Sequence, residues 1–310
     1  MAVTASYAYS KQFDRNILRM FLNEYAARDP EYTKIAKIKD APAGKVYTEA
    51  EISGLGPAQE VPEGTAVPFD LPVEGNQVSR PFLQYGLGYQ LTLIAREDDV
   101  HGKLEKVAKT LAIAMNTKIE MEFFKLFNLG NTNQYAWDGK PIFANNHTTL
   151  KSGTTISNVT NAALSETALQ AAFEYFDNLV DEAGNPIADL KLDLLVVPSQ
   201  LRWVAMRLAK QEGGITSTAA NSPDLSGNDM TTNPANGYVG AWKIHVSRYL
   251  NDPDNWFALS SAHEMTLMWK RRVILESGED FKTANRLYRV WARFGAFCNP
   301  YKPVYGAFPA

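Results

Sequence analysis

Cysteine is almost absent from this sequence, which contains a single one, Cys298, in 310 residues. One cysteine excludes an intramolecular disulfide framework and offers no cysteine spacing for a metal. Long apolar runs are missing as well: no stretch of about 18 consecutive apolar residues occurs, and the start MAVTASYAYSK lacks the basic and apolar regions of a signal peptide. We therefore expect a protein that folds in a reducing cytoplasm and does not associate with a membrane.

The signatures of common enzyme classes are also missing. The sequence lacks the GxSxG elbow, the GxxxxGK[ST] phosphate loop and HExxH, and Gly86-Leu87-Gly88 is too short for a dinucleotide fingerprint. Its four histidines are scattered through segments of different type, at His101, His147, His245 and His263. We interpret them as surface or core-satisfied side chains. The sequence thus predicts no enzyme activity, no catalytic residue, no cofactor and no metal site.

Positive charge is not in excess. The chain has 31 Lys and Arg against 34 Asp and Glu, a formal net charge of -3. A dedicated nucleic-acid binder needs a clustered positive surface, so we expect at most weak, non-specific contact with DNA. The share of hydrophobic residues, 45%, and of charged residues, 21%, suits one large or two medium globular domains with a sizeable core.

The first 80 residues are predicted to form projections and not a domain. Residues 1–40 carry only a weak helical repeat and indicate an arm. Residues 46–80 are rich in Pro, Gly and Glu and too poor in large apolar side chains to form a core. Their composition favours a disordered linker, whereas the alternating segment PFLQYGLGYQLTLIA that follows favours a long projecting hairpin.

The strongest helical signal covers residues 98–129. Apolar side chains such as Leu104 and Phe123 recur with helical spacing, while Asp98 suits the N-terminus and Gly130 the end of the helix. Roughly 30 residues with a rise of 1.5 Å each make a helix of ~45 Å, well over twice the usual length. This pattern predicts one long helix with a structural role.

The remaining sequence alternates helices and strands and predicts a compact α/β unit. Ser165 is expected to cap a helix, and LDLLVVP at 192–198 is expected to be a buried strand followed by the helix QLRWVAMRLAK. The polar segment 212–237 is predicted to be a surface loop. Further strands follow, and LYRVWARFGAF at 287–297 alternates so that one strand should have two unlike faces.

One ordered set of segments carries a family resemblance. WDGKPIFANNH at 137–147, with a tight Asp-Gly turn, is followed by ALSETALQAAFEYFDNLVDEAGNPI and then by LDLLVVPSQLRWVAMRLAK. In this order and spacing the segments resemble the major head subunits of Mu-like phages and prophages, which belong to the capsid family with the Hong Kong 97 fold. The resemblance covers roughly residues 85–275.

The resemblance implies an α+β fold of the Hong Kong 97 type, with an extended β-hairpin loop, a long spine helix and an α/β axial domain. The implied boundaries are an N-terminal arm at 1–40, an extended loop at 41–92, a peripheral domain at 93–159 and 276–310 with its spine helix at 98–129, and an axial domain at 160–275.

The same resemblance implies a major capsid protein of a tailed bacteriophage. Such a protein self-assembles through pentameric and hexameric capsomers into an icosahedral shell around double-stranded DNA, is made in the bacterial host cytoplasm, and works with a scaffolding protein, a portal and a decoration protein. An encapsulin-like nanocompartment shell is an alternative, which small enzyme cargo would reveal. A soluble hydrolase or transferase is a second alternative, which a monomer with one deep, charged pocket would support.

The distribution of charge suggests where subunits meet. The hairpin region is acidic, and a shell subunit needs complementary surfaces on its neighbours. We expect the intersubunit contacts to involve the acidic residues Glu49, Glu51, Glu60, Glu63, Asp70 and Glu74, and the basic residues Lys103, Lys106, Lys109, Arg271 and Arg272.

A covalent link between subunits is not expected. The founding member of the family joins neighbours by an isopeptide bond from a lysine on its extended loop, and a lysine amine is the nucleophile that this reaction requires. Here no lysine occurs between Lys45, at the base of the loop, and Lys103.

Overall fold

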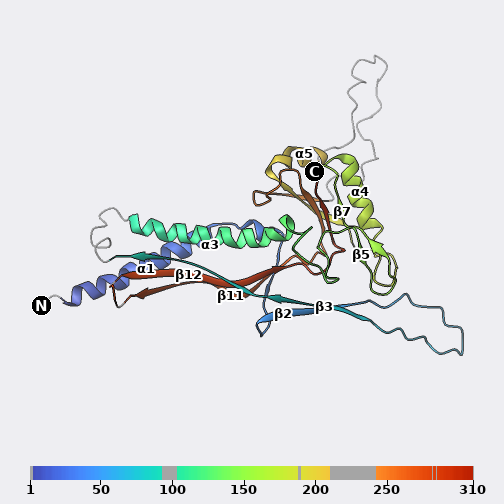
Figure 1. Cartoon of the computed structure of the whole chain (residues 1–310), viewed down its shortest axis with the longest axis horizontal. Coiled ribbons are helices and arrows are strands. Elements are labelled where there is room, and N and C mark those ends of the chain that lie inside the picture. The colour runs from blue at the N-terminus through green and yellow to red at the C-terminus, as the bar shows by residue number, and fades with distance from the viewer. Residues whose placement is uncertain are drawn as a thin grey trace, which may run out of the picture. The chain divides into compact units, whose positions relative to one another are not determined.

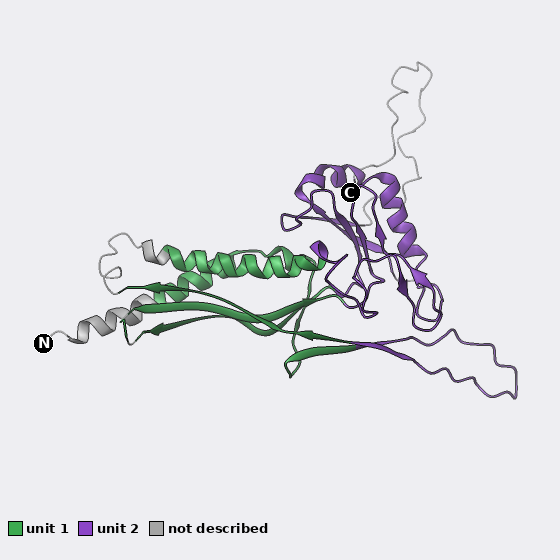
Figure 2. Cartoon of the chain, viewed as in Figure 1, with its two compact units in different colours: residues 1–49, 78–126, 265–298 green, residues 50–77, 127–264, 299–310 purple. Residues whose placement is uncertain are grey.

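The computed structural model describes residues 3–92, 103–187, 190–209, 242–280, 282–283 and 285–309, with side chains described from residue 15 in the first range and 106 in the second. These residues form two compact units, which Figure 2 shows in different colours. Unit 1 comprises residues 1–49, 78–126 and 265–298, and unit 2 comprises residues 50–77, 127–264 and 299–310. The polar segment 212–237, His101 and the predicted start of the long helix at Asp98 lie outside the described residues.

Unit 1 is a long four-stranded sheet with helices along one face (Figure 1). The strand order is β1-β11-β12-β4, in which β1 is parallel to β11 and the other neighbours are antiparallel. Its elements are α1 (Val3–Ala27), η1 (Glu31–Lys34), β1 (Lys37–Asp40), β4 (Leu83–Leu91), α3 (Lys103–Asn128, whose last two residues fall in unit 2), β11 (Thr266–Glu279) and β12 (Arg286–Phe297).

The strand β12 has the two unlike faces that its sequence predicts. Tyr288 and Val290 are buried, whereas Arg289 and Trp291, which alternate with them, belong to the opposite face. Tyr288 packs in one cluster with Ile17 of α1, Ala108 of α3 and Leu91 of β4. Both helices therefore cover the same face of the sheet, and the face of Arg289 and Trp291 is turned away from them.

Two helices give unit 1 its length. The helix α3 has 26 residues, and its inward side chains, among them Met115 and Phe123, are buried as their periodicity predicts. The N-terminal segment, expected to be an arm with a weak helical pattern, instead contains the continuous 25-residue helix α1. Burial of Ile17 and Phe21 explains the difference, because tertiary packing stabilises a helix whose own propensity is modest.

Unit 2 is built around a five-stranded sheet with strand order β7-β13-β10-β8-β9. The predicted strand LDLLVVP is β8, and Ser165 caps α4 as expected, since its side chain accepts a hydrogen bond from the Ala168 amide. The elements are β5 (His147–Thr148), β6 (Thr155–Ile156), β7 (Val159–Thr160), α4 (Glu166–Asp177), β8 (Leu192–Pro198), η2 (Ser199–Leu201), α5 (Arg202–Ala209), β9 (Lys243–Ser247), β10 (Trp256–Ser260) and β13 (Val304–Ala307). Phe173, Leu195 and Ala205 join α4, β8 and α5 in one core.

The acidic segment forms a hairpin. Its arms pair as β2 (Val46–Ile52) and β3 (Glu74–Pro81), and residues 53–73 connect them without a regular strand (Figure 1). The hairpin interpretation of this segment is thus confirmed, and its linker alternative is not.

The compact units group some segments differently from the boundaries that the resemblance implies. Residues 127–159 belong to unit 2, and residues 265–275 belong to unit 1. The implied arm, loop, peripheral and axial boundaries therefore stay a prediction. Among the described residues, no helix is long and apolar enough to cross a lipid bilayer.

Candidate subunit-contact surfaces

The far part of the hairpin exposes large apolar side chains. Phe69 is 94% exposed and Leu71 is 76% exposed, and Val67 lies beside them at 63%. The acidic residues Glu60, Glu63 and Glu74 are exposed on the same segment, and the sequence has no basic residue between Lys45 and Arg80. Clustered exposed apolar groups among charges mark an interaction site.

Contacts within the same chain hold the hairpin in place. Ser53 bridges the two arms, because its amide donates to the Val73 carbonyl at 2.9 Å and its hydroxyl accepts from the Val73 amide at 2.8 Å. Lys151 Nζ lies 2.7 Å from both carboxylate oxygens of Asp70. Asp70 also accepts a hydrogen bond from the Gly56 amide at 2.8 Å. These bonds reduce the freedom of a segment that has no core of its own.

Leu150 packs closely against the second arm. A Cβ atom at Gly75 would lie 2.6 Å from Leu150 Cδ1, so any larger residue at this position would require the leucine side chain to move. The sequence shows Gly75 but not this contact, because the two residues lie far apart in the chain.

Glu51 is buried near the end of β2, where the connecting segment 53–73 begins, and is only 3% exposed. Burial raises the pKa of Glu51 to about 7; the Glu182 carboxylate adds to this increase, the Lys302 ammonium opposes it, and Asp138 contributes a smaller increase. Lys302 forms an ion pair with Glu182, which also accepts a hydrogen bond from the Leu150 amide at 2.6 Å. Glu51 therefore lies near a polar cluster that contains Glu182 and Lys302.

The segment WDGKPIFANNH supplies a second buried polar arrangement in unit 2. Asp138 Oδ2 lies 2.8 Å from His147 Nδ1, and the other ring nitrogen lies 3.2 Å from the Ile142 carbonyl oxygen. The imidazole stacks on Tyr301, with ring centroids 4.0 Å apart and an interplanar angle of 3°. Gly139 adopts φ 73°, as the Asp-Gly turn requires.

His147 is a core-satisfied histidine, as the sequence interpretation holds. Burial acts to raise the pKa of Asp138, but the hydrogen bond and charge of His147 outweigh it, so this pKa lies below its usual value. Both ring nitrogens face acceptors, so the side chain cross-links the turn to its own segment. Within the described ranges, no group of three or more His, Cys, Asp or Glu residues could hold a metal ion.

The basic residues predicted to meet a neighbour lie in unit 1. Lys106 and Lys109 are exposed on α3, while the side chain of Lys103 lies outside the described residues. On β11, Arg271 stands over the Trp291 ring at 4.7 Å, and Arg272 pairs with Asp40 at 3.0 Å. Neither contact follows from the sequence alone.

The structure sorts the predicted acidic residues into two groups. Glu60, Glu63 and Glu74 are exposed, as intersubunit contact requires. Glu51 is buried and Asp70 is bound by Lys151, so in the isolated chain neither carboxylate is exposed and unbound as an intersubunit contact requires. Glu49 is half-buried on β2.

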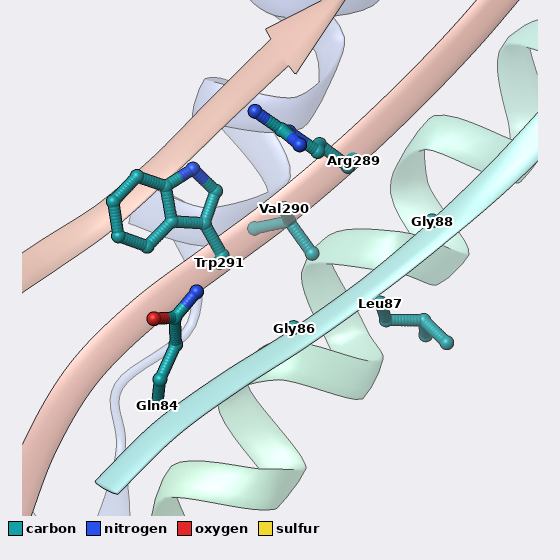
Figure 3. Close-up of a pocket in the computed structure, with 7 residues that line it drawn as sticks. All are labelled: Gln84, Gly86, Leu87, Gly88, Arg289, Val290 and Trp291. Atoms are coloured by element: carbon teal, nitrogen blue, oxygen red, sulfur yellow. The ribbon is translucent and has the colours of Figure 1, made fainter.

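A groove lies on unit 1 between β4 and β12, with a volume of about 330 Å³ (Figure 3). Figure 3 shows Gln84, Trp291 and Arg289 around a stretch of β4 that has no side chains at Gly86 and Gly88. Gly86 and Gly88 are too few for a nucleotide motif, and their place in this groove was not predicted from the sequence. Their spacing of two residues on a strand was the available signal, because such residues share one face.

A comparison with family models decides the class of protein. Residues 77–305 match the model described as phage capsid protein. The chain belongs to the phage capsid protein family. A search of curated proteins finds no match to this capsid protein.

Solved structures agree with the fold that the resemblance implies. The capsid of the native GTA particle is 9% identical, with a TM-score of 0.57 and coverage of 92% of each chain. Microbacterium phage Oxtober96 is 11% identical, with a TM-score of 0.53 and coverage of 91% of this chain and 92% of the other. The virus-like particle from Pyrococcus furiosus is 9% identical, with a TM-score of 0.53 and coverage of 93% and 96%.

These comparisons bear on the two alternative functions, a soluble enzyme and a cellular nanocompartment shell. The α+β capsid fold and the family are those of a structural protein, which disfavours a soluble hydrolase or transferase. The family model describes a phage capsid protein, which favours a phage shell over a cellular nanocompartment.

Proposed function

We propose that this protein is the major subunit of an icosahedral phage shell, assembled through pentamers and hexamers around double-stranded DNA. The observation that carries the proposal is the exposed hairpin segment 53–73 in a chain of the phage capsid family. This segment buries few of its apolar side chains within its own chain. Their burial by a neighbouring subunit therefore stabilises the assembly. Contacts between unlike surfaces can close into rings and then into a shell.

The charges of the exposed surfaces suggest how neighbours attract one another. We infer that Glu60, Glu63 and Glu74 of one subunit approach basic residues of another. The candidates on the receiving side are Lys103, Lys106, Lys109, Arg271 and Arg272. Opposite charges steer association and fix its register, and their effect weakens beyond about 8 Å at physiological salt.

We also propose binding partners and a location for this protein. A scaffolding protein, a portal and a decoration protein are the expected partners, and contact with packaged DNA is expected to be weak because the net charge is -3. The protein is expected to be made and assembled in the bacterial host cytoplasm and to reside in the virion.

The test is to express the chain and to examine purified material by electron microscopy and sedimentation. Shells or capsomers support the proposal, and a uniform monomer at high concentration contradicts it. Particles that hold small enzyme cargo and no DNA would instead favour a nanocompartment. A variant without residues 55–75 should stay folded, because the segment adds little to a core, yet should not form shells. Stable shells from this variant would contradict the role of the hairpin.

A further inference from the structure

The groove on unit 1 has the features of a binding site for an aromatic side chain. Because Gly86 and Gly88 have no side chains, only the β4 backbone lines the bottom of the groove at these two positions. A Cβ atom at Gly88 would lie 3.0 Å from the Tyr288 carbonyl oxygen. The indole of Trp291 forms a wall and is supported by the Arg271 guanidinium at 4.7 Å. The groove is open to solvent, and its volume of about 330 Å³ exceeds that of a cavity of about 150 Å³ that holds benzene, so a phenyl ring fits in it with one side exposed.

The groove is basic at its margin. Arg289 lines it, and its side chain is 71% exposed even though it pairs with Glu276 at 2.6 Å. Arg271 lies over the Trp291 ring, and Arg293 belongs to the same face of β12 as Trp291. Three arginines against one glutamate give this face a positive balance, which suits an acidic partner.

The hairpin carries a matching element. Phe69 is 94% exposed and stands in the segment Pro68-Phe69-Asp70-Leu71-Pro72. Prolines restrict φ and keep such a segment extended, which lowers the entropy that binding removes. Extended proline-containing segments are commonly bound in grooves lined by aromatic residues. Glu63 and Glu74 add exposed negative charge on the same hairpin.

We propose that Phe69 of one subunit inserts into the groove formed by Gly86, Gly88 and Trp291 on a second copy of this chain. The proposal rests on the proposed function and names the partner surface of the hairpin. The hairpin fits the groove in two respects. Its exposed aromatic side chain can fill the space that the glycines leave open, and its negative charge complements the positive charge of the groove.

Chemical cross-linking tests this placement directly. Leu71→Cys and Gln84→Cys are introduced into separate subunits, which are mixed, assembled and treated with a short bismaleimide; native Cys298 is buried. We expect a linked dimer on a denaturing gel when both variants are present. The same experiment with Val61→Cys in place of Leu71→Cys is the matched control and should give little product. Addition of Phe69→Ser to the Leu71→Cys subunit should remove the link.

Substitution of the groove floor provides a second measurement. Gly86→Val places methyl groups in the groove, since a Cβ there meets its nearest neighbours at 3.4 Å without requiring backbone change. Gly278→Val makes the same substitution in β11 of the same sheet, where a Cβ meets nothing within 4 Å, and is the control. We expect Phe69→Ser and Gly86→Val each to raise the subunit concentration needed for assembly about tenfold or more, with Gly278→Val unchanged.

The outcomes separate this inference from the proposed function. Shells that form from the unmodified chain but give no specific link, or that tolerate both Phe69→Ser and Gly86→Val, overturn the groove assignment and leave the capsid function intact. Failure of the unmodified chain to assemble under any condition counts against the proposed function itself. A link that depends on Phe69 together with assembly loss in Gly86→Val establishes the assignment.

Discussion

Lys151 binds Asp70 from within the same chain, with its Nζ atom 2.7 Å from each carboxylate oxygen. This ion pair joins the far part of the hairpin to the turn between β5 and β6. The hydrogen bonds from Lys151 and from the Gly56 amide hold the pKa of Asp70 below its usual value. One of the six acidic residues expected to meet a neighbour is therefore used to position the hairpin that carries the others.

We predict that Asp70→Asn or Lys151→Met loosens the hairpin without unfolding the subunit. The pair is partly exposed, with side chains 42% and 31% accessible, so global stability should change little. Limited proteolysis should cut residues 53–73 several-fold faster, roughly in proportion to the more frequent local opening. Glu63→Gln, which changes an exposed carboxylate on the same hairpin, is the control. Equal protease resistance in all variants would show that the ion pair does not restrain the loop.

The free energy of unfolding should depend on pH because the pKa of Glu51 is raised in the folded protein. Its folded-state pKa of about 7 lies above the ordinary glutamate value of 4.5, so its favourable contribution is complete below about pH 4.5 and is lost as pH rises through 7. The charged form then lies near Glu182 and Asp138, with Lys302 as the compensating cation.

Glu51→Gln should therefore stabilise the subunit at pH 8 and have little effect at pH 4.5. A gain on the order of 1 kcal/mol or more is expected at pH 8, because one unit of pKa difference corresponds to about 1.4 kcal/mol. Urea unfolding of the isolated subunit at both pH values measures the difference. Glu60→Gln, on the exposed hairpin, is the control, and a Glu51→Gln effect that does not vary with pH would refute the assignment.

The Asp138–His147 pair is predicted to stabilise the unit that contains it. Asp138→Asn removes the charged acceptor of a fully buried imidazole and should lower the free energy of unfolding by about 1–3 kcal/mol. Since the pKa of Asp138 is lowered in the folded protein, its contribution is present above the ordinary aspartate pKa and fades as pH falls through the folded value. The difference between variant and parent should thus shrink below about pH 4.

Thermal and urea unfolding at several pH values measure this effect. Asp177→Asn, at the exposed end of α4, is a matched control that should change stability by a few tenths of a kcal/mol at most. A similar loss in both variants would mean that the pairing with His147 contributes nothing specific.

Mature shells are predicted to lack covalent links between subunits. The hairpin has no lysine beyond Lys45, which lies at its base just before β2, so the amine that an isopeptide bond requires is absent from the exposed segment. Cys298 is buried, so we expect no disulfide between subunits. Boiled, reduced shells should give one band near 34.5 kDa on a denaturing gel. A ladder of larger species that resists reduction would contradict this reading of the hairpin.

The sequence by itself determined the local elements and the family. The period of its apolar residues specifies α3, the Ser165 cap specifies the start of α4, and alternation specifies the two faces of β12. These features were predictable because each depends on residues a few positions apart, where helix and strand geometry decide which side chains share a face. The ordered segments after the long helix likewise identified a capsid fold, which the family match confirms.

Tertiary structure alone decided how these elements are used. Asp70 and Lys151 are 81 residues apart in sequence, and the pKa of Glu51 depends on its burial and on Glu182 and Lys302 from remote segments. The groove exists because antiparallel pairing sets Gly86 opposite Trp291. The burial of Ile17 and Phe21 of α1 likewise depends on contacts with elements that are distant in the sequence. Composition and local periodicity do not encode such contacts, because the energy of burial depends on which distant side chains the folded chain brings together.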